Sequence, residues 1–103
     1  MIQVVAIITA QPGQRAAVLE AFAANRPAVL AEAGCIEYNA AIDAEGLPPS
    51  KGSIGPDTFM VIEKWESMAA LQAHAAAPHM LAYGAQTKPL VASRLIHILQ
   101  PAG

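Results

Sequence analysis

Residues 59–74 change from the pattern of a β-strand to that of an α-helix within a few positions. The segment up to Trp65 is rich in β-branched and aromatic residues that alternate between two faces, as in a strand. Ser67 is suited to cap a helix, and the Ala-rich segment after it predicts a helix through Ala76. Trp65 and His74 lie in this stretch, and an aromatic ring near a titratable group suggests a small-molecule pocket.

The rest of the chain continues this alternation of strands and helices. The predicted segments are a strand at 2–9, a helix at 15–33, strands at 35–43 and 58–65, helical pieces at 67–76 and 78–86, and a strand at 94–100. This β-α-β-β-α-β order is typical of the ferredoxin-like fold. We therefore expect an α+β protein with a four-stranded antiparallel sheet and helices on one face.

The length of 103 residues fits one domain, and no internal repeat is present, so residues 1–103 are expected to form a single domain. Residues 43–57 are rich in Gly and Pro and predict a long loop that is either mobile or functional, with mobility favoured. Pro27 lies inside the first predicted helix. Because proline removes a backbone hydrogen bond, a kink or a restart is expected near Asn25 and Arg26.

Composition and charge exclude several functions. The net charge is −2 and the six cationic residues are scattered, so no basic stripe is available for nucleic acid. No apolar run approaches the roughly 18 residues of a membrane span, and no signal peptide is recognised. The single Cys35 cannot form an intrachain disulfide. A cytoplasmic location is expected.

The apolar residues of the first and last predicted strands indicate a partner chain. Right-handed crossovers place both helices on one face of the sheet. The strands at 2–9 and 94–100 nevertheless carry apolar residues on both faces. One layer of helices would leave a large apolar patch exposed, which soluble monomers avoid. We expect a homodimer whose sheets pack together, with His97 at or near the interface.

Three motifs support a family resemblance that extends over almost the whole chain. They are Gly34-Cys-Ile-Glu-Tyr-Asn39, Glu63-Lys-Trp65-Glu, and Leu71-x-x-His74-x-x-x-Pro78-His79. In this order and at these separations, the chain resembles the antibiotic biosynthesis monooxygenase family, including its quinol monooxygenase branch. The resemblance implies a dimeric α+β barrel. It also implies oxygenation of electron-rich phenols or quinols with O₂ and without metal, flavin or haem.

The chain departs from two other branches of this family. A branch that acts on polycyclic phenols has Asn where Val61 stands and His where Asn39 stands, so two polar contacts of that branch are absent or changed. The haem-degrading branch uses an Asn in the first strand, and residues 2–9 contain none. The loop 43–57 is also longer than expected for the simplest quinol oxidases and is predicted to cover the cavity mouth.

The resemblance and the residue types together predict a site. His74 is expected at the edge of an apolar helix face, where it can act as a base, and Trp65 is expected to form a cavity wall. Both also fit structural roles, His74 as a partly exposed surface residue and Trp65 as a core residue. Glu63 and His79 are further candidates for substrate binding, although Glu63 also fits a structural ion pair.

Asn39 is the last candidate for substrate binding. It lies on the opposite strand face from Tyr38, so at most one of the two can line a given pocket, and Asn39 is favoured. The spacing of five between His74 and His79 does not suit a helical zinc pair, and no metal site is expected.

These residues fit three functions. The first is a cofactor-independent monooxygenase that oxidises a small quinol or phenol with O₂. The second is a non-catalytic dimeric barrel that binds a small aromatic or carbonyl ligand in stress response or sensing. The third is an isomerase or lyase in which His74 shuttles a proton. The fold cannot separate them, because function resides in the site.

Overall fold

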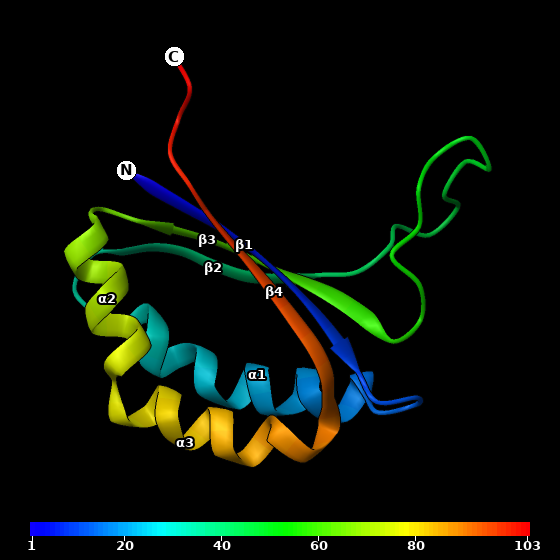
Figure 1. Cartoon of the computed structure of the whole chain (residues 1–103), viewed down its shortest axis with the longest axis horizontal. Coiled ribbons are helices and arrows are strands. Elements are labelled where there is room, and N and C mark those ends of the chain that lie inside the picture. The colour runs from blue at the N-terminus through cyan, green and yellow to red at the C-terminus, as the bar shows by residue number, and fades with distance from the viewer.

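The computed structural model describes all 103 residues and contains the predicted elements in the predicted order. They are β1 (Ile2–Ala10), α1 (Arg15–Leu30), β2 (Cys35–Ala41), β3 (Thr58–Trp65), α2 (Met68–Ala76), α3 (Pro78–Thr87) and β4 (Val91–Leu99), with a short 3₁₀ turn (Lys88–Leu90) before β4. The four strands form one antiparallel sheet in the order β2-β3-β1-β4. All helices lie on the same face of this sheet (Figure 1). The predicted ferredoxin-like α+β fold is therefore confirmed.

The boundaries of three elements differ from the prediction. The helix α1 continues through Pro27 without a restart and ends at Leu30. Proline costs this helix one hydrogen bond, but the residues beyond it include Val29, which is completely buried. Burial of that turn therefore outweighs the local defect. The strand β4 begins three residues earlier than expected, at Val91, and β2 ends earlier, at Ala41.

The second helical region is divided by proline. Ser67 accepts a hydrogen bond from the backbone nitrogen of Ala70 and so caps α2, as predicted. Ala77 is extended (φ −63°, ψ 137°), because a residue before proline avoids the helical conformation. Pro78 then begins α3, which runs beside α1 in Figure 1, whereas α2 lies at the end of the sheet. This bend separates α2 and α3 around one end of the core.

Gly34 lets the turn after α1 lie close to α2. Its φ of +84° belongs to the left-handed region, which favours glycine. A Cβ at this position would lie 2.6 Å from the Cβ of Ala70, so even alanine would force the two segments apart. The backbone nitrogen of Glu66 also donates to the Gly34 carbonyl oxygen at 2.9 Å. These contacts bring Glu32, two residues earlier, to the C-terminal part of α2.

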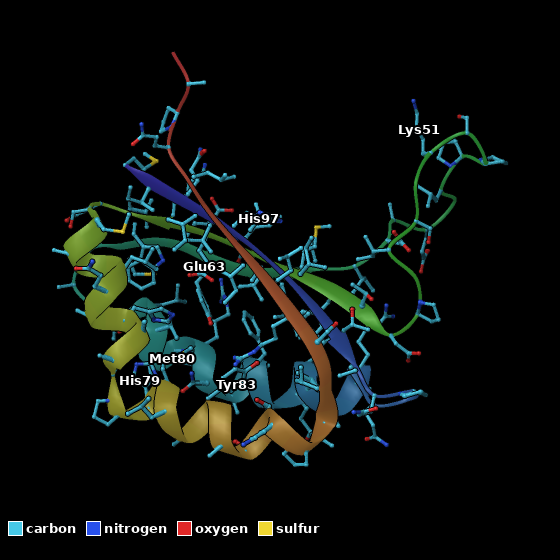
Figure 2. All side chains as sticks on the ribbon, in the orientation of Figure 1. Lys51, Glu63, His79, Met80, Tyr83 and His97 are labelled. Carbon is cyan, nitrogen blue, oxygen red and sulfur yellow. The ribbon has the colours of Figure 1, made fainter.

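The sheet face opposite the helices is apolar and uncovered. Leu95 and Leu99 are about half exposed there, and His97 lies between them opposite Val5 of β1. Figure 2 shows His97 on the side of the sheet away from the helices. Ile62 of β3 adds to the same face. The expected apolar patch is present, and we propose that a second copy of the chain covers it.

The proposed dimer predicts a mass of twice 10.7 kDa in light scattering at low micromolar concentration. Leu95→Glu places a charge on the apolar face and should shift the protein towards the monomer. The control Gln86→Glu makes the same charge change on an exposed helix position and should leave the mass unchanged. A wild-type protein that stays folded and monomeric would contradict the proposed dimer.

Candidate functional site

A cavity of about 570 Å³ lies between the sheet and the helices, as the sequence predicts. Its volume is within the usual range for small-molecule sites. Of its 22 lining residues, 16 are hydrophobic. They come from all four strands and from α1, α2 and α3, with β1 and β4 contributing one wall and α2 and α3 the other. The cavity is therefore suited to an apolar ligand that makes a few polar contacts.

The cavity exists because β4 is not covered by a helix. Ile96 and Ile98 face the helix side of the sheet, since they pair with the buried Ala6 and Val4 of β1. Yet they are 54% and 53% exposed, whereas their β1 partners are buried. The helices thus enclose the space under β1 and leave it open towards β4. This open side gives a ligand access from solvent.

Glu63 and Trp65 form a buried polar pair on β3. They lie on the same sheet face by the period of two, and the indole Nε1 of Trp65 donates to Glu63 Oε1 at 2.9 Å. Both side chains are buried, but Glu63 lines the cavity and Trp65 does not. Burial raises the pKa of Glu63 above its usual value, although the bond from Trp65 partly opposes this. Trp65 therefore does not form the cavity wall as expected, but hydrogen-bonds to Glu63, which does.

His74 lies in the cavity wall and is almost fully buried, at 5% exposure, rather than partly exposed. Its ring centroid is 4.6 Å from that of Trp65 and 5.5 Å from that of Tyr38. Its Nδ1 lies 2.7 Å from Glu32 Oε2. The other ring nitrogen, Nε2, makes no hydrogen bond within the chain. One nitrogen of His74 is therefore held by a carboxylate and the other is free.

His79 lies on the far side of Glu32 and does not line the cavity. Its Nδ1 is 3.1 Å from Oδ1 of Asn25, and its Nε2 is 3.6 Å from Glu32 Oε2. That Nε2 is buried without a hydrogen-bond partner. Figure 2 shows His79 at the junction of α2 and α3. His79 thus belongs to the surroundings of Glu32 and not to the cavity wall.

Asn39 does not reach the cavity, contrary to its expected role in substrate binding. The register of β2 on β3 pairs Tyr38 with Glu63 and Asn39 with Ile62, so Tyr38 faces the helices and Asn39 the opposite side. Asn39 is exposed and bonds to Arg26 and Glu37. Tyr38 is buried in the cavity wall instead, and its burial raises the pKa of its hydroxyl.

The loop 43–57 lies away from the cavity and supplies none of its lining residues, contrary to the expectation that it covers the mouth. It extends from the end of the sheet beyond the helices (Figure 1), and Lys51 lies near its outer end (Figure 2). Asp43 closes its base by accepting hydrogen bonds from Ser53 and from the backbone of Ile54 and Gly55. These bonds hold the pKa of Asp43 below its usual value.

The sequence reasoning missed three residues of this region, Glu32, Tyr83 and Arg94, and it weighed Tyr38 but favoured Asn39. Tyr83 and Arg94 line the cavity from α3 and β4, and Figure 2 shows Tyr83 on α3 below the sheet. Arg94 could have been found from the period of two, because it shares a strand face with Ile96 and Ile98. Glu32 offered no such signal, since it lies in a turn and meets His74 only through the tertiary fold.

The structure has no cluster of three or more His, Cys, Asp or Glu side chains placed to hold a metal ion. Its helices are all too short or too polar to cross a membrane.

Comparison with known proteins identifies the family. A sequence model of the antibiotic biosynthesis monooxygenase family matches residues 1–86. The chain is 46% identical over 104 residues to the probable quinol monooxygenase YgiN of Escherichia coli (strain K12), with 98% of each chain covered. The corresponding protein of Shigella flexneri has the same identity and coverage.

Solved structures agree with this result. A Pseudomonas aeruginosa protein matches with a TM-score of 0.80 and 27% identity over 99% of this chain and 94% of its own. A Mycobacterium tuberculosis protein matches with a TM-score of 0.80 and 26% identity over 99% and 95%. A putative antibiotic biosynthesis monooxygenase from Nitrosomonas europaea shares the fold, with a TM-score of 0.83 at 17% identity and complete coverage of both chains. The chain therefore belongs to the antibiotic biosynthesis monooxygenase family.

Proposed function

We propose that this protein is a cofactor-independent monooxygenase that oxidises a small quinol or phenol with O₂. The observation that carries the proposal is the placement of His74 in the wall of an apolar cavity, with its Nδ1 held by Glu32 and its Nε2 free. The family and the 46% identity to a probable quinol monooxygenase support the same reaction class.

Glu32 determines which nitrogen of His74 can act as a base. A carboxylate 2.7 Å from Nδ1 favours the tautomer that carries its proton on that atom. The lone pair of the neutral ring is then on Nε2, which can accept a proton from a substrate hydroxyl. The same carboxylate stabilises the imidazolium that forms. His74 is thus the proposed catalytic base, and Glu32 is a positioning residue.

Deprotonation prepares a quinol to react with O₂, because the anion gives up an electron more readily than the neutral molecule. For a naphthalene-1,4-diol, one O₂ yields the 2-hydroxy-1,4-quinone and one water, so the quinol supplies both electrons and no external reductant is needed. The apolar cavity limits contact between water and the radical pair. Its volume of about 570 Å³ accommodates one or two aromatic rings.

Two buried hydroxyl-bearing groups can orient the ring. Burial raises the pKa of Tyr38 and that of Glu63, so Tyr38 stays neutral at physiological pH and Glu63 keeps its proton to a higher pH than an exposed glutamate. Both line the cavity near His74. A neutral phenol and a carboxyl group can hydrogen-bond to the oxygen atoms of a bound quinol. Trp65 supports this arrangement by its bond to Glu63.

His74→Gln should lower the rate of quinol oxidation by about 10²- to 10⁴-fold, the usual effect of losing a positioned base. The measurement is O₂ consumption with menadiol in metal-chelated buffer, after subtraction of the autoxidation rate. Trp65→Phe keeps an aromatic ring but removes the bond to Glu63, and should have a smaller effect.

Wild-type rates equal to autoxidation across several quinols would rule out the oxygenase and favour a binding module. Equal rates in wild type and His74→Gln, both above autoxidation, would exclude His74 as the base.

Glu32→Gln should lower kcat by roughly tenfold or more and move the pH profile of kcat, because a neutral amide stabilises the imidazolium less than a carboxylate. A purely structural role would change the melting temperature without moving the pH profile. The control Glu20→Gln removes one negative charge from an exposed position of α1, the helix before that turn, and should leave both unchanged. An unaltered pH profile in Glu32→Gln would show that Glu32 does not tune His74.

Glu63→Gln should raise the melting temperature at pH 7. The raised pKa of Glu63 means that folding favours its protonated form, so its stabilising contribution is complete at low pH and is lost as the pH rises through the raised pKa. The amide keeps an oxygen for Trp65 and carries no charge, so the advantage of the variant should shrink as the pH approaches about 4. The control Glu45→Gln, in the exposed loop, should show no such gain. Equal melting temperatures for wild type and Glu63→Gln at pH 7 would contradict a raised pKa of Glu63 in the folded protein.

A further inference from the structure

Lys88 and Arg94 are cationic side chains without a hydrogen-bond or ion-pair partner in the chain, and they lie together. Other cations of the chain are used structurally: Arg26 donates to the Tyr38 carbonyl oxygen at 2.7 Å, and Lys64 pairs with Glu37 at 3.4 Å. Lys88 and Arg94 instead line a pocket of about 560 Å³ between the end of α3 and the start of β4.

This pocket adjoins the apolar cavity. Both spaces are lined by the same four residues, Gly84, Thr87, Val91 and Arg94. No acidic side chain lines the pocket, and Ser93 adds a hydroxyl donor. The two spaces together therefore have an apolar centre. Glu63 and His74 lie on one side of it, and the unpaired positive charges of Lys88 and Arg94 lie on the other. A neutral quinol would leave those charges without a partner.

We propose that the pocket is a subsite for an anionic substituent of the substrate, and that the substrate is an aromatic that carries a carboxylate. This assignment rests on the proposed function, because it takes the apolar cavity as the site of the reacting ring. The planar guanidinium of Arg94 suits a carboxylate, which it can bind through two parallel hydrogen bonds. Lys88 contributes a second positive charge at the same pocket.

The sheet register indicates the shape of this ligand. Arg94 pairs with Ile8 of β1, and Glu63 pairs with Val4. These positions differ by four residues along β1, which is roughly 13 Å of strand. All of them face the helices, so a ligand between the two ends follows the cavity. A two-ring aromatic with a hydroxyl at one end and a carboxylate at the other has the required form.

Binding of two matched probes in the absence of O₂ tests the subsite without any turnover. The pair is 6-hydroxy-2-naphthoate and 2-naphthol, which differ only in the carboxylate. Both probes are phenols, so calorimetry is carried out without O₂ and measures binding to the wild-type protein alone. We expect the naphthoate to bind about tenfold more tightly than the naphthol at low ionic strength, and the preference to shrink in high salt.

Variants assign the preference to residues. Arg94→Gln should bring the two affinities to within about twofold of each other, mainly by weakening the binding of the naphthoate. Lys88→Gln should have a smaller effect in the same direction. The matched control Lys51→Gln removes one positive charge from the loop near its outer end and should keep the full preference. Equal binding of both probes by the wild type, or an unchanged preference in Arg94→Gln, would overturn the subsite.

The test of the anionic subsite can fail or succeed independently of the test of the oxygenase. A naphthoate preference that depends on Arg94, together with O₂ consumption no faster than autoxidation, would keep the subsite and reject the oxygenase. Quinol oxidation that depends on His74, without any preference for the naphthoate, would keep the oxygenase and reject the subsite.

Discussion

The hydrogen bond between Glu32 and His74 joins the parts of the molecule on which the site depends. It links the turn after α1 to the helix α2 at 2.7 Å, in a place where both side chains are largely removed from solvent. A carboxylate is tolerated there because the imidazole satisfies it. In return, the bond holds the ring of His74 beside Trp65 and Tyr38 and leaves Nε2 unused. The orientation of the proposed base is thus a property of two segments far apart in the sequence.

Gly34 makes this contact possible. Glu32 can reach α2 only because the turn that follows it approaches Ala70 at a distance that excludes a Cβ. The same approach brings the start of β2 to the end of β3, where Cys35 pairs with Trp65. Gly34, which is needed for its backbone conformation, therefore controls the placement of the Glu32 carboxylate near the cavity. Such a link is invisible when each residue is considered by its own chemistry.

The cavity follows from an imbalance between the sheet and its helices. The helices cover β1 and β3 closely, and the residues of those strands that face them are buried. They leave β4 uncovered, so the inward side chains Ile96 and Ile98 border an open space instead of a core. A fully covered sheet would be better packed and would have no room for a ligand. The open edge accordingly combines access from solvent with an apolar interior.

The sequence by itself determined the order of the elements and the α+β class, because the periods of two and 3.6 residues and the positions of Ser67 and Pro78 are local signals. It also pointed to Glu63 and His74, whose residue types are rare on apolar faces. It did not determine which face of β2 meets the cavity, so Asn39 was chosen in place of Tyr38. That choice depends on the register between β2 and β3, which pairs Tyr38 with Glu63. The partnership of Glu32 with His74 and the position of the loop 43–57 were likewise decided only by the tertiary structure, because contacts between distant segments leave no periodic trace in the chain.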